Sequence, residues 1–326
     1  MARKSVRSMA FCLAVCFILA KHSAASPPPI LFNTLDYPGA VFTRLTGIQN
    51  GTIVGTYAVS NFVINEGFTY DSSGFLPIRD PHEGLFGTWV SAISGNQIVG
   101  SYYDSASLEH GFVYDGSTYQ DIDDPLRNSA VANSDELHGI SGNIMVGYFI
   151  DNSNAVHGYI YDGAQFQTLN YPAGSITVPR GIEGNKIVGS YFMSGGDHGW
   201  LYNGSTFTPI EDPLAGVHGT DANGISGNYI VGSYTDPNNT IHGFYFDGTN
   251  YYTVDFPGSL FTEVVGIQGN TIVGDYSLAE GDGINSLQGF IATIPEPSTW
   301  VLALLSFAIA FAWQLKFSRT AKLKSA

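Results

Sequence analysis

A repeat of about 44 residues constrains the fold of this chain more than any other feature. A Val-Gly pair recurs six times, at spacings of 45, 47, 42, 43 and 42 residues, and a Gly-aromatic pair follows each copy. The first set is Val54-Gly55 with Gly67-Phe68, and the last is Val273-Gly274 with Gly289-Phe290. A period of this length indicates copies of one supersecondary unit that pack against each other.

Each copy holds four short runs of strand character separated by turn signals. In the second copy these runs are residues 89–93, 97–103, 110–114 and 118–122. Ser94-Gly95-Asn96 and Asp115-Gly116 lie between them, and Asp-Gly is a strong hairpin signal. Four antiparallel strands in each period are typical of a β-propeller blade.

The ends of the repeat array predict how a ring would close. The sixth copy stops after its third strand, at residues 290–293, whereas residues 31–38 duplicate the fourth-strand segment 165–172. We therefore expect an all-β, six-bladed propeller over residues 30–293, in which the N-terminal strand completes the last blade. Closure leaves no exposed sheet edge, which the alternative, a linear β-solenoid, would have to cap.

Charge and cysteine usage exclude several functions. Between the two ends of the chain, five basic residues stand against 27 acidic ones. Nucleic acid is therefore not an expected partner, because its binding needs clustered Lys and Arg. Both cysteines, Cys12 and Cys16, lie in the first hydrophobic stretch. The domain thus has no thiol for a disulfide, for catalysis or for zinc.

Residues 1–25 have the layout of a secretory signal peptide. A basic start precedes an apolar run over residues 9–20, and small residues end at Ala25. We expect export with cleavage at Ala25. A lipoprotein box at Cys16 is the alternative, but the apolar run continues past it.

The C-terminal residues 294–326 combine a motif, an apolar stretch and a basic tail. Pro295-Glu296-Pro297 precedes the stretch from Trp300 to Trp313, and four basic residues follow it. Terminal aromatic residues and a basic cluster are typical of a transmembrane segment with a cytoplasmic tail. The stretch is short for a stable span, which suits a transient membrane anchor.

This tail resembles the PEP-CTERM sorting signal. The resemblance implies a Gram-negative bacterium and an exosortase, a membrane enzyme that cuts near Pro295-Glu296-Pro297, often in species that make exopolysaccharide. An ordinary tail anchor is the alternative, and both place the domain outside the cytoplasm. The repeat text, with Gly-Asn-x-Ile-Val-Gly-x-Tyr before His-Gly-Phe-x-Tyr-Asp-Gly, is similar over residues 31–293 to the extracellular repeats named HAF, a family that implies no established reaction.

Histidines and carboxylates are the candidate functional side chains. His110, His157, His198 and His242 occupy one repeat position, so a ring would spread them apart, and we expect each to bond a neighbouring backbone group. Acidic residues before proline gather on the face that also carries the variable loops. They could hold Ca²⁺, or each could cap a strand and begin a turn. These candidate metal ligands are Asp80, Asp123, Asp124, Glu211, Asp212 and Asp255.

The sequence contains no Gly-x-Ser-x-Gly, P-loop or His-Glu-x-x-His motif, so it predicts no catalytic residue and no cofactor besides Ca²⁺. We expect a non-catalytic surface or extracellular-matrix protein whose loop face binds exopolysaccharide, a cation or a surface protein. The alternative is a glycosidase or lyase working from the same face. His, Tyr and acidic side chains converging over the channel would favour the enzyme, and a pseudo-symmetric face would favour the scaffold.

Overall fold

The structure, a computed structural model, describes residues 29–59, 65–131, 135–172, 174, 176–193, 195–278 and 287–295. The chain divides into two units, of which Leu31–Ile294 is the domain described below. Ala25, Glu296, Pro297 and the apolar stretch after them lie outside the described residues. Among the residues that are described, no helix has the length and apolar character needed to cross a membrane.

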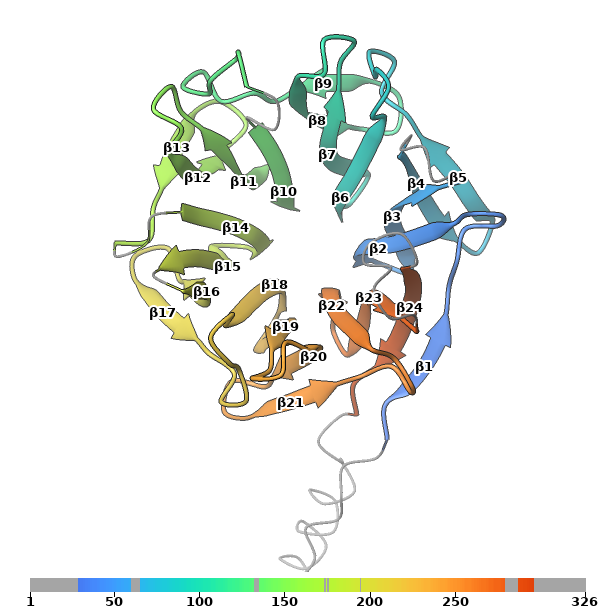
Figure 1. The fold of residues 1–326 in the computed structure, drawn as a ribbon. Coiled ribbons are helices and arrows are strands. Elements are labelled where there is room, and N and C mark those ends of the chain that lie inside the picture. Colours follow the sequence, from blue (N-terminus) through green and yellow to red (C-terminus); the bar gives the residue numbers. More distant parts are fainter. Residues whose placement is uncertain are drawn as a thin grey trace, which may run out of the picture. The chain divides into compact units, whose positions relative to one another are not determined.

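The described strands of the domain form antiparallel groups of four around a central opening (Figure 1). Single parallel residue pairs, Val156 with Ile176 and Ile241 with Phe261, join neighbouring groups into two eight-stranded sheets. The innermost strands are β2 (Phe42–Gln49), β6 (Thr88–Ser94), β10 (Asp135–Ser141), β14 (Ile176–Glu183), β18 (Thr220–Ser226) and β22 (Phe261–Gln268). The second strands are β3 (Thr52–Ala58), β7 (Gln97–Tyr103), β11 (Ile144–Ile150), β15 (Lys186–Met193), β19 (Tyr229–Thr235) and β23 (Thr271–Ser277).

The outer half of each group has the same order. The third strands are β4 (Glu66–Asp71), β8 (Glu109–Tyr114), β12 (Val156–Tyr161), β16 (Gly196–Tyr202), β20 (Ile241–Phe246) and β24 (Gln288–Thr293). The outermost strands are β5 (Gly74–Ile78), β9 (Tyr119–Asp121), β13 (Phe166–Leu169), β17 (Phe207–Ile210), β21 (Tyr251–Val254) and β1 (Leu31–Thr34). In the second copy the predicted strands differ from β6, β7, β8 and β9 by one residue at most at each end.

The N-terminal strand β1 pairs with β24, the last described strand of the domain (Figure 1). Leu31 lies opposite Thr293, and Thr34 lies opposite Phe290. The first described strand thus lies in one sheet with the last described strand. The two ends of the domain consequently lie side by side.

The ring has two different faces. The turn face carries the short turns after the first and third strands of each group, such as residues 95–96 and 115–118. The loop face carries the loops after the second strands, such as residues 104–108, and the connections between groups, such as residues 79–87. The backbone N–H of Ile294 donates to the carbonyl of Asn270 in a first-to-second-strand turn, so the chain leaves the domain on the turn face.

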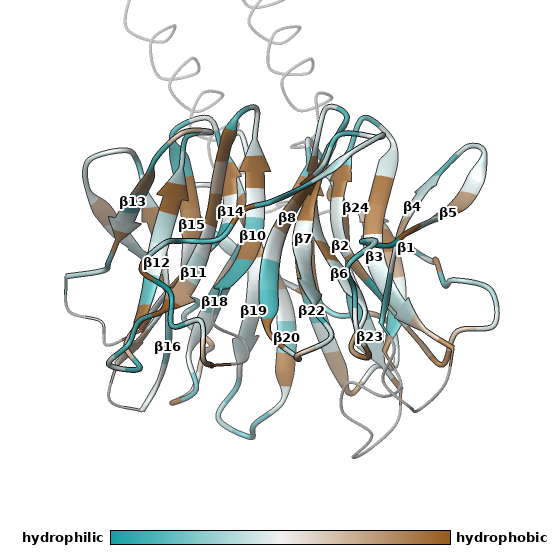
Figure 2. Ribbon diagram, turned by 90° about the horizontal axis from the view of Figure 1, so that it is seen from above, coloured by the Kyte–Doolittle hydropathy of each residue, from teal (hydrophilic) through white to brown (hydrophobic). Residues whose placement is uncertain are grey.

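One contact accounts for both repeated motifs. The aromatic residue of each Gly-aromatic pair is fully buried, as Phe68 and Phe290 are. A Cβ placed on Gly55 would lie 2.7 Å from the ring of Phe68 and would also overlap the carbonyl oxygen of Arg44. The Val-Gly glycine therefore opens the space that the aromatic ring fills. Figure 2 shows the apolar stretches of this core running along the strands.

Neighbouring groups are joined at the turn face by a repeated hydrogen bond. The last side chain of each inner strand accepts a bond from a backbone N–H in the first turn of the next group. The bonds run from Gly95 to Gln49, Gly142 to Ser94, Gly184 to Ser141, Gly227 to Glu183, Gly269 to Ser226 and Asn50 to Gln268. These contacts explain why a polar residue precedes each turn.

Candidate functional site

Three of the six predicted metal ligands are buried caps on the loop face. Asp80, Asp124 and Asp212 are at most 4% exposed. Each accepts a hydrogen bond at 2.8 Å from the backbone N–H two residues later. This is the geometry of the capping alternative, in which the carboxylate begins the turn that leads to the next group.

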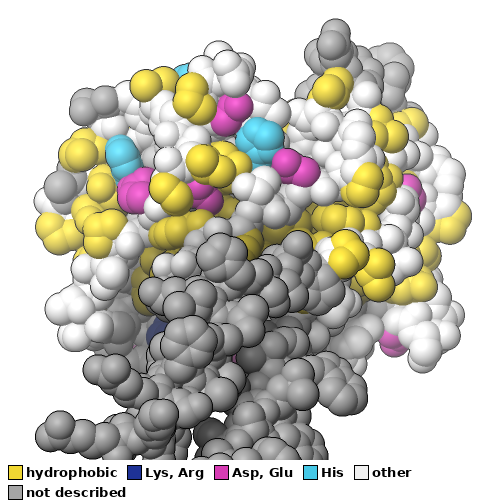
Figure 3. Space-filling model, turned by 90° about the horizontal axis from the view of Figure 1, so that it is seen from below, with side chains coloured by type: hydrophobic (Ala, Val, Ile, Leu, Met, Phe, Trp, Pro, Cys, Tyr) yellow, Lys and Arg dark blue, Asp and Glu magenta, His cyan; other side chains and the backbone are white. Residues whose placement is uncertain are grey.

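The other three predicted ligands contact histidines. His110 Nδ1 lies 2.8 Å from Asp123, His198 Nδ1 lies 2.9 Å from Glu211, and His242 Nδ1 lies 3.0 Å from Asp255. The hydrogen bond that His110 donates to the Asp123 carboxylate raises the pKa of His110. We expected each of these histidines to have a structural role by bonding a neighbouring backbone group. The structural role is compatible with these contacts, but the partner is a carboxylate side chain and not a backbone group. Figure 3 shows histidine side chains beside acidic ones on the surface in view.

The candidate ligands do not converge on one point. They lie on four different connections around the loop face, after β5, β9, β17 and β21. Among the described residues, no three His, Cys, Asp or Glu side chains are grouped so that they could hold a metal ion. Their carboxylate groups instead accept hydrogen bonds from backbone N–H groups of turns or contact histidine side chains.

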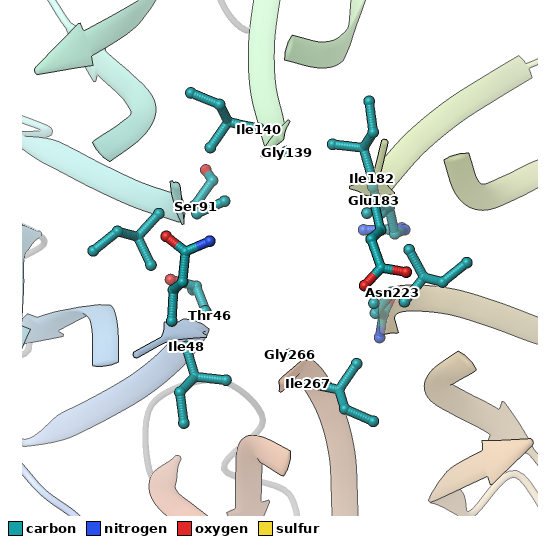
Figure 4. Close-up of a pocket in the computed structure, with 18 of the residues that line it drawn as sticks. Thr46, Ile48, Ser91, Gly139, Ile140, Ile182, Glu183, Asn223, Gly266 and Ile267 are labelled. Carbon is teal, nitrogen blue, oxygen red and sulfur yellow. The ribbon is translucent and has the colours of Figure 1, made fainter. Parts of the chain in front are cut away.

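The inner strands line a central channel, and its turn-side half is nearly symmetric. A cavity of about 170 Å³ there is lined by residues of each inner strand. One of the lining positions is isoleucine in every copy, at Ile48, Ile93, Ile140, Ile182, Ile225 and Ile267. Figure 4 shows Ile48, Ile140, Ile182 and Ile267 surrounding the opening.

The loop-side half of the channel, here called the channel mouth, is polar and irregular. Its cavity of about 120 Å³ is lined by Arg44, Thr46, Trp89, Val90, Ser91, Glu136, His138, Arg180, Asn223, Glu263 and Val265. The inner-strand positions that precede the isoleucine layer carry cations, carboxylates, an amide and an indole in different copies. The repeat symmetry is broken at this layer.

Most charges at the channel mouth are paired with each other. Arg44 contacts Glu263 at 3.1 Å and Asp275 at 3.0 Å, and Arg180 lies 3.5 Å from Asp221. Burial raises the pKa of Asp275 to about 8, although Arg44 opposes this shift. The fully buried carboxyl group of Asp275 therefore lies behind the residues that line the channel.

A second cluster joins β10 to its neighbours. His138 lies 3.2 Å from Glu136 through Nε2, and its Nδ1 lies 2.9 Å from the carbonyl oxygen of Pro179. Burial would raise the pKa of Glu136, but His138, Tyr148 and Arg180 outweigh it and lower the pKa. Burial, together with the charge of Glu136, raises the pKa of Glu109. The two carboxyl groups thus differ in proton affinity.

Sequence reasoning did not identify the channel-mouth residues. Trp89, Glu136, Arg180 and Asn223 belong to no motif. The signal was the difference between repeats at two inner-strand positions. Alignment of the copies gives Thr, Ser, His, Arg, Asn and Val at one position and Arg, Trp, Glu, Val, Asp and Glu at the other. The histidine and Asp-Pro patterns were easier to see because they recur.

Comparisons with known proteins identify the fold. No family model matches this chain, and no curated protein matches it. A structure described as TolB from Agrobacterium tumefaciens matches at 15% identity, with 82% of this chain and 92% of that chain covered and a TM-score of 0.51. The SapL1 lectin in complex with α-methyl fucoside matches at 13% identity, with 79% and 98% covered and a TM-score of 0.51.

A looser match is the six-bladed β-propeller lectin of Aleuria aurantia, at 16% identity, with 70% of this chain and 77% of that chain covered and a TM-score of 0.43. At these identities a likeness concerns the fold. The ring of four-stranded groups, with the likeness to the TolB and SapL1 structures, defines the domain as a repeat-built, all-β propeller.

Proposed function

We propose that this chain is a six-bladed β-propeller closed by its N-terminal strand, and that it is exported as a non-catalytic binding module of the cell surface or extracellular matrix. An exosortase would process the tail at Pro295-Glu296-Pro297, and exopolysaccharide would be the surrounding material. The SapL1 lectin was described with a methyl fucoside, and a saccharide is the ligand class that we propose for this chain.

One observation carries the proposal. Leu31 of the first strand pairs with Thr293 of the last described strand, in keeping with a rigid scaffold that presents its variable loops on one face. Binding residues are usually found on loops that a rigid scaffold positions. We therefore place the ligand on the loop face.

Epitope insertion into the full chain tests export on intact cells. One tag follows Asn238 in the loop after β19, and the matched tag follows Gly248 in the turn after β20. We expect antibody to label both tags on intact cells, because export places the whole domain outside the membrane. Labelling of either tag only after lysis would contradict export.

A second candidate function has its own support. Glu136, His138 and Tyr148 lie together beside the channel. Glu109 is close enough for the charge of Glu136 to raise its pKa. Two carboxyl groups with opposite pKa shifts are typical of acid and base pairs. A glycosidase or lyase is therefore the alternative.

Incubation of the full chain with exopolysaccharide oligosaccharides distinguishes the two functions. An enzyme would release reducing ends or an unsaturated product, and Glu136→Gln would abolish that release, whereas His242→Ala on the rim would not. A binding module leaves the oligosaccharides intact, which is the outcome that we expect.

A further inference from the structure

We propose that Asn50 is a site of spontaneous deamidation, and that its conversion to isoaspartate loosens the contact between the last and first copies of the repeat. Deamidation is favoured where glycine follows asparagine, because glycine leaves the attacking backbone nitrogen uncrowded. The chain contains three such pairs, Asn50-Gly51, Asn203-Gly204 and Asn223-Gly224. The reaction needs no ligand, so it does not depend on the binding function proposed above.

The reaction begins at the backbone nitrogen of the glycine. The nitrogen of Gly51 attacks the side-chain carbonyl carbon of Asn50, and a new C–N bond closes a succinimide ring. The side-chain nitrogen leaves as ammonia, taking up the proton that the Gly51 nitrogen loses. Water then opens the ring at either carbonyl, which gives aspartate or isoaspartate.

The first copy of the repeat has the reactive order because its turn after the inner strand is reversed. In the other copies this turn reads Gly-Asn, at Gly95-Asn96, Gly142-Asn143, Gly184-Asn185, Gly227-Asn228 and Gly269-Asn270. Gly95 has a φ of +63° and Asn96 has none above zero, as in a type II′ turn. Asn50 and Gly51 have φ values of +50° and +81°, as in a type I′ turn.

The reversal also removes a bond that other copies make. Their turn asparagine donates from Nδ2 to a backbone carbonyl in the turn between the third and fourth strands. These bonds, of 2.7–2.9 Å, join Asn96 to Asp115, Asn143 to Asp162 and Asn185 to Asn203. Gly51 has no side chain with which to make this bond, so the first turn of the first copy loses it.

The Asn50 side chain is also less constrained than that of Asn203. Asn50 is exposed, and its Oδ1 accepts a hydrogen bond of 3.3 Å from Nε2 of Gln268. Asn203 is exposed as well, but its Oδ1 accepts three bonds of 2.9–3.0 Å from Ser205 and Thr206, and its Nδ2 donates to Thr206 Oγ1. These bonds must break before the Asn203 carbonyl can meet the next nitrogen.

Asn223 is protected by the sheet. It is 7% exposed and lies within β18. Its Nδ2 donates to Glu263 Oε1 at 3.0 Å and to the carbonyl of Val264 at 3.1 Å. Ring closure requires a rotation of the main chain that the paired strand opposes. Of the three pairs, the one at Asn50 is therefore the first to react.

The product acts on the contact between the ends of the array. The N–H of Asn50 donates to Gln268 Oε1 at 2.6 Å. Isoaspartate routes the main chain through the former side chain, which adds one carbon to the turn and replaces a neutral amide with a negative charge. A two-residue hairpin turn depends on its exact length. The lengthened turn moves the N–H away from Gln268.

Peptide mapping of the full chain tests the site. The protein is incubated at mildly alkaline pH and digested, and mass spectrometry follows the gain of one mass unit at each asparagine. We expect Asn50 to convert about tenfold faster or more than Asn203 and Asn223, which corresponds to about 1.4 kcal/mol in activation free energy. Enzymatic methylation of isoaspartate verifies the product.

Two variants serve as matched tests. Asn50→Gly combined with Gly51→Asn restores the turn order of the other copies and should stop conversion at this turn. Gln268→Ala removes the bond to the Asn50 side chain and should speed conversion about twofold or more, since an exposed hydrogen bond contributes little. Thermal melts before incubation verify that both variants are folded.

Thermal melts after incubation test the effect on the ends of the array. The Tm of the unaltered chain should fall as isoaspartate accumulates at Asn50, whereas that of the reversed-turn variant should stay constant. An unchanged Tm at high conversion would show that the contact is not loosened. Conversion of Asn203 or Asn223 before Asn50, or no conversion at Asn50, would overturn the site itself. None of these results bears on saccharide binding, so the proposed function stands or fails separately.

Discussion

The Oε1 atom of Gln268 accepts a hydrogen bond of 2.6 Å from the backbone N–H of Asn50, although 218 residues separate the two. This bond joins the last copy of the repeat to the first, in the same way that each earlier copy joins the next. Leu45 and Asp275 add a second bond, in which the Leu45 N–H donates to Oδ1 at 2.9 Å. The ends of the array thus meet through side chains as well as through β1.

Gln268→Ala should lower the free energy of unfolding by about 0.5–1.5 kcal/mol, because the N–H of Asn50 loses its acceptor. The bond is exposed, so the effect should fall in the lower half of that range. Urea unfolding measures it. Gln120→Ala, an exposed glutamine on β9, is the control, and an equal loss in that variant would mean that the bond contributes nothing specific.

Gly100→Ala should destabilise the domain by about 3 kcal/mol or more, since a Cβ there overlaps the carbonyl oxygen of Trp89 and neighbouring strands must move apart. Gly116→Ala should lose only about 1 kcal/mol, because its φ of +96° is unfavourable for alanine but no atom lies within 4 Å. Urea midpoints of the two variants give the comparison. Similar losses would show that the backbone conformation, and not the Trp89 contact, explains the repeated glycine.

Asp135 and Tyr159 form a buried pair found in one copy of the repeat. Tyr159 Oη donates to Asp135 Oδ1 at 3.1 Å, whereas the equivalent pair in the next copy is Thr177 with Trp200. Asp135→Thr alone should cost about 1–3 kcal/mol, because the Tyr159 hydroxyl stays buried without an acceptor. Adding Tyr159→Phe should recover that loss. A double-mutant cycle by urea unfolding measures the coupling, and additive effects would contradict it.

The same carboxyl group predicts a pH dependence. Burial raises the pKa of Asp135 from 3.8 to about 8, so the folded state holds a proton that the unfolded state has lost between these values. Stability should therefore fall as the pH rises from about 4 to about 8. Asp135→Asn should flatten this slope. Unfolding measured from pH 5 to 8, with Asp71→Asn at a half-buried residue as control, tests the prediction, and an unchanged slope in Asp135→Asn would refute it.

Calcium should leave the domain unaffected. The six candidate carboxylates are bonded to backbone N–H groups or to histidines on four separate connections. We expect the same Tm after chelation and after Ca²⁺ addition, because a ligand raises Tm only if it binds the folded state. A rise on adding Ca²⁺ would show that the loop face holds a cation in spite of these bonds.

The sequence predicted the strands well because their signals are local and repeated. Asp115-Gly116 indicates its hairpin because the two turn residues are adjacent in the sequence. The duplicate of residues 165–172 at the N-terminus predicted the pairing of β1 with β24. The channel mouth could not be predicted in this way. Trp89 and Asn223 line one cavity only because the ring brings their strands together. A side chain that differs in every copy has no repeat to reveal it.

A pair of engineered cysteines tests the closed ring most directly. Leu31→Cys and Thr293→Cys place thiols on directly opposed residues of β1 and β24, within the usual Cα range for a disulfide. Both residues are exposed, and residues 26–326 contain no other cysteine. The account predicts an intramolecular disulfide that raises Tm, and no disulfide for Leu31→Cys with Gln288→Cys. Disulfide-linked dimers, or free thiols in the first pair, would contradict closure of the ring by its own N-terminal strand.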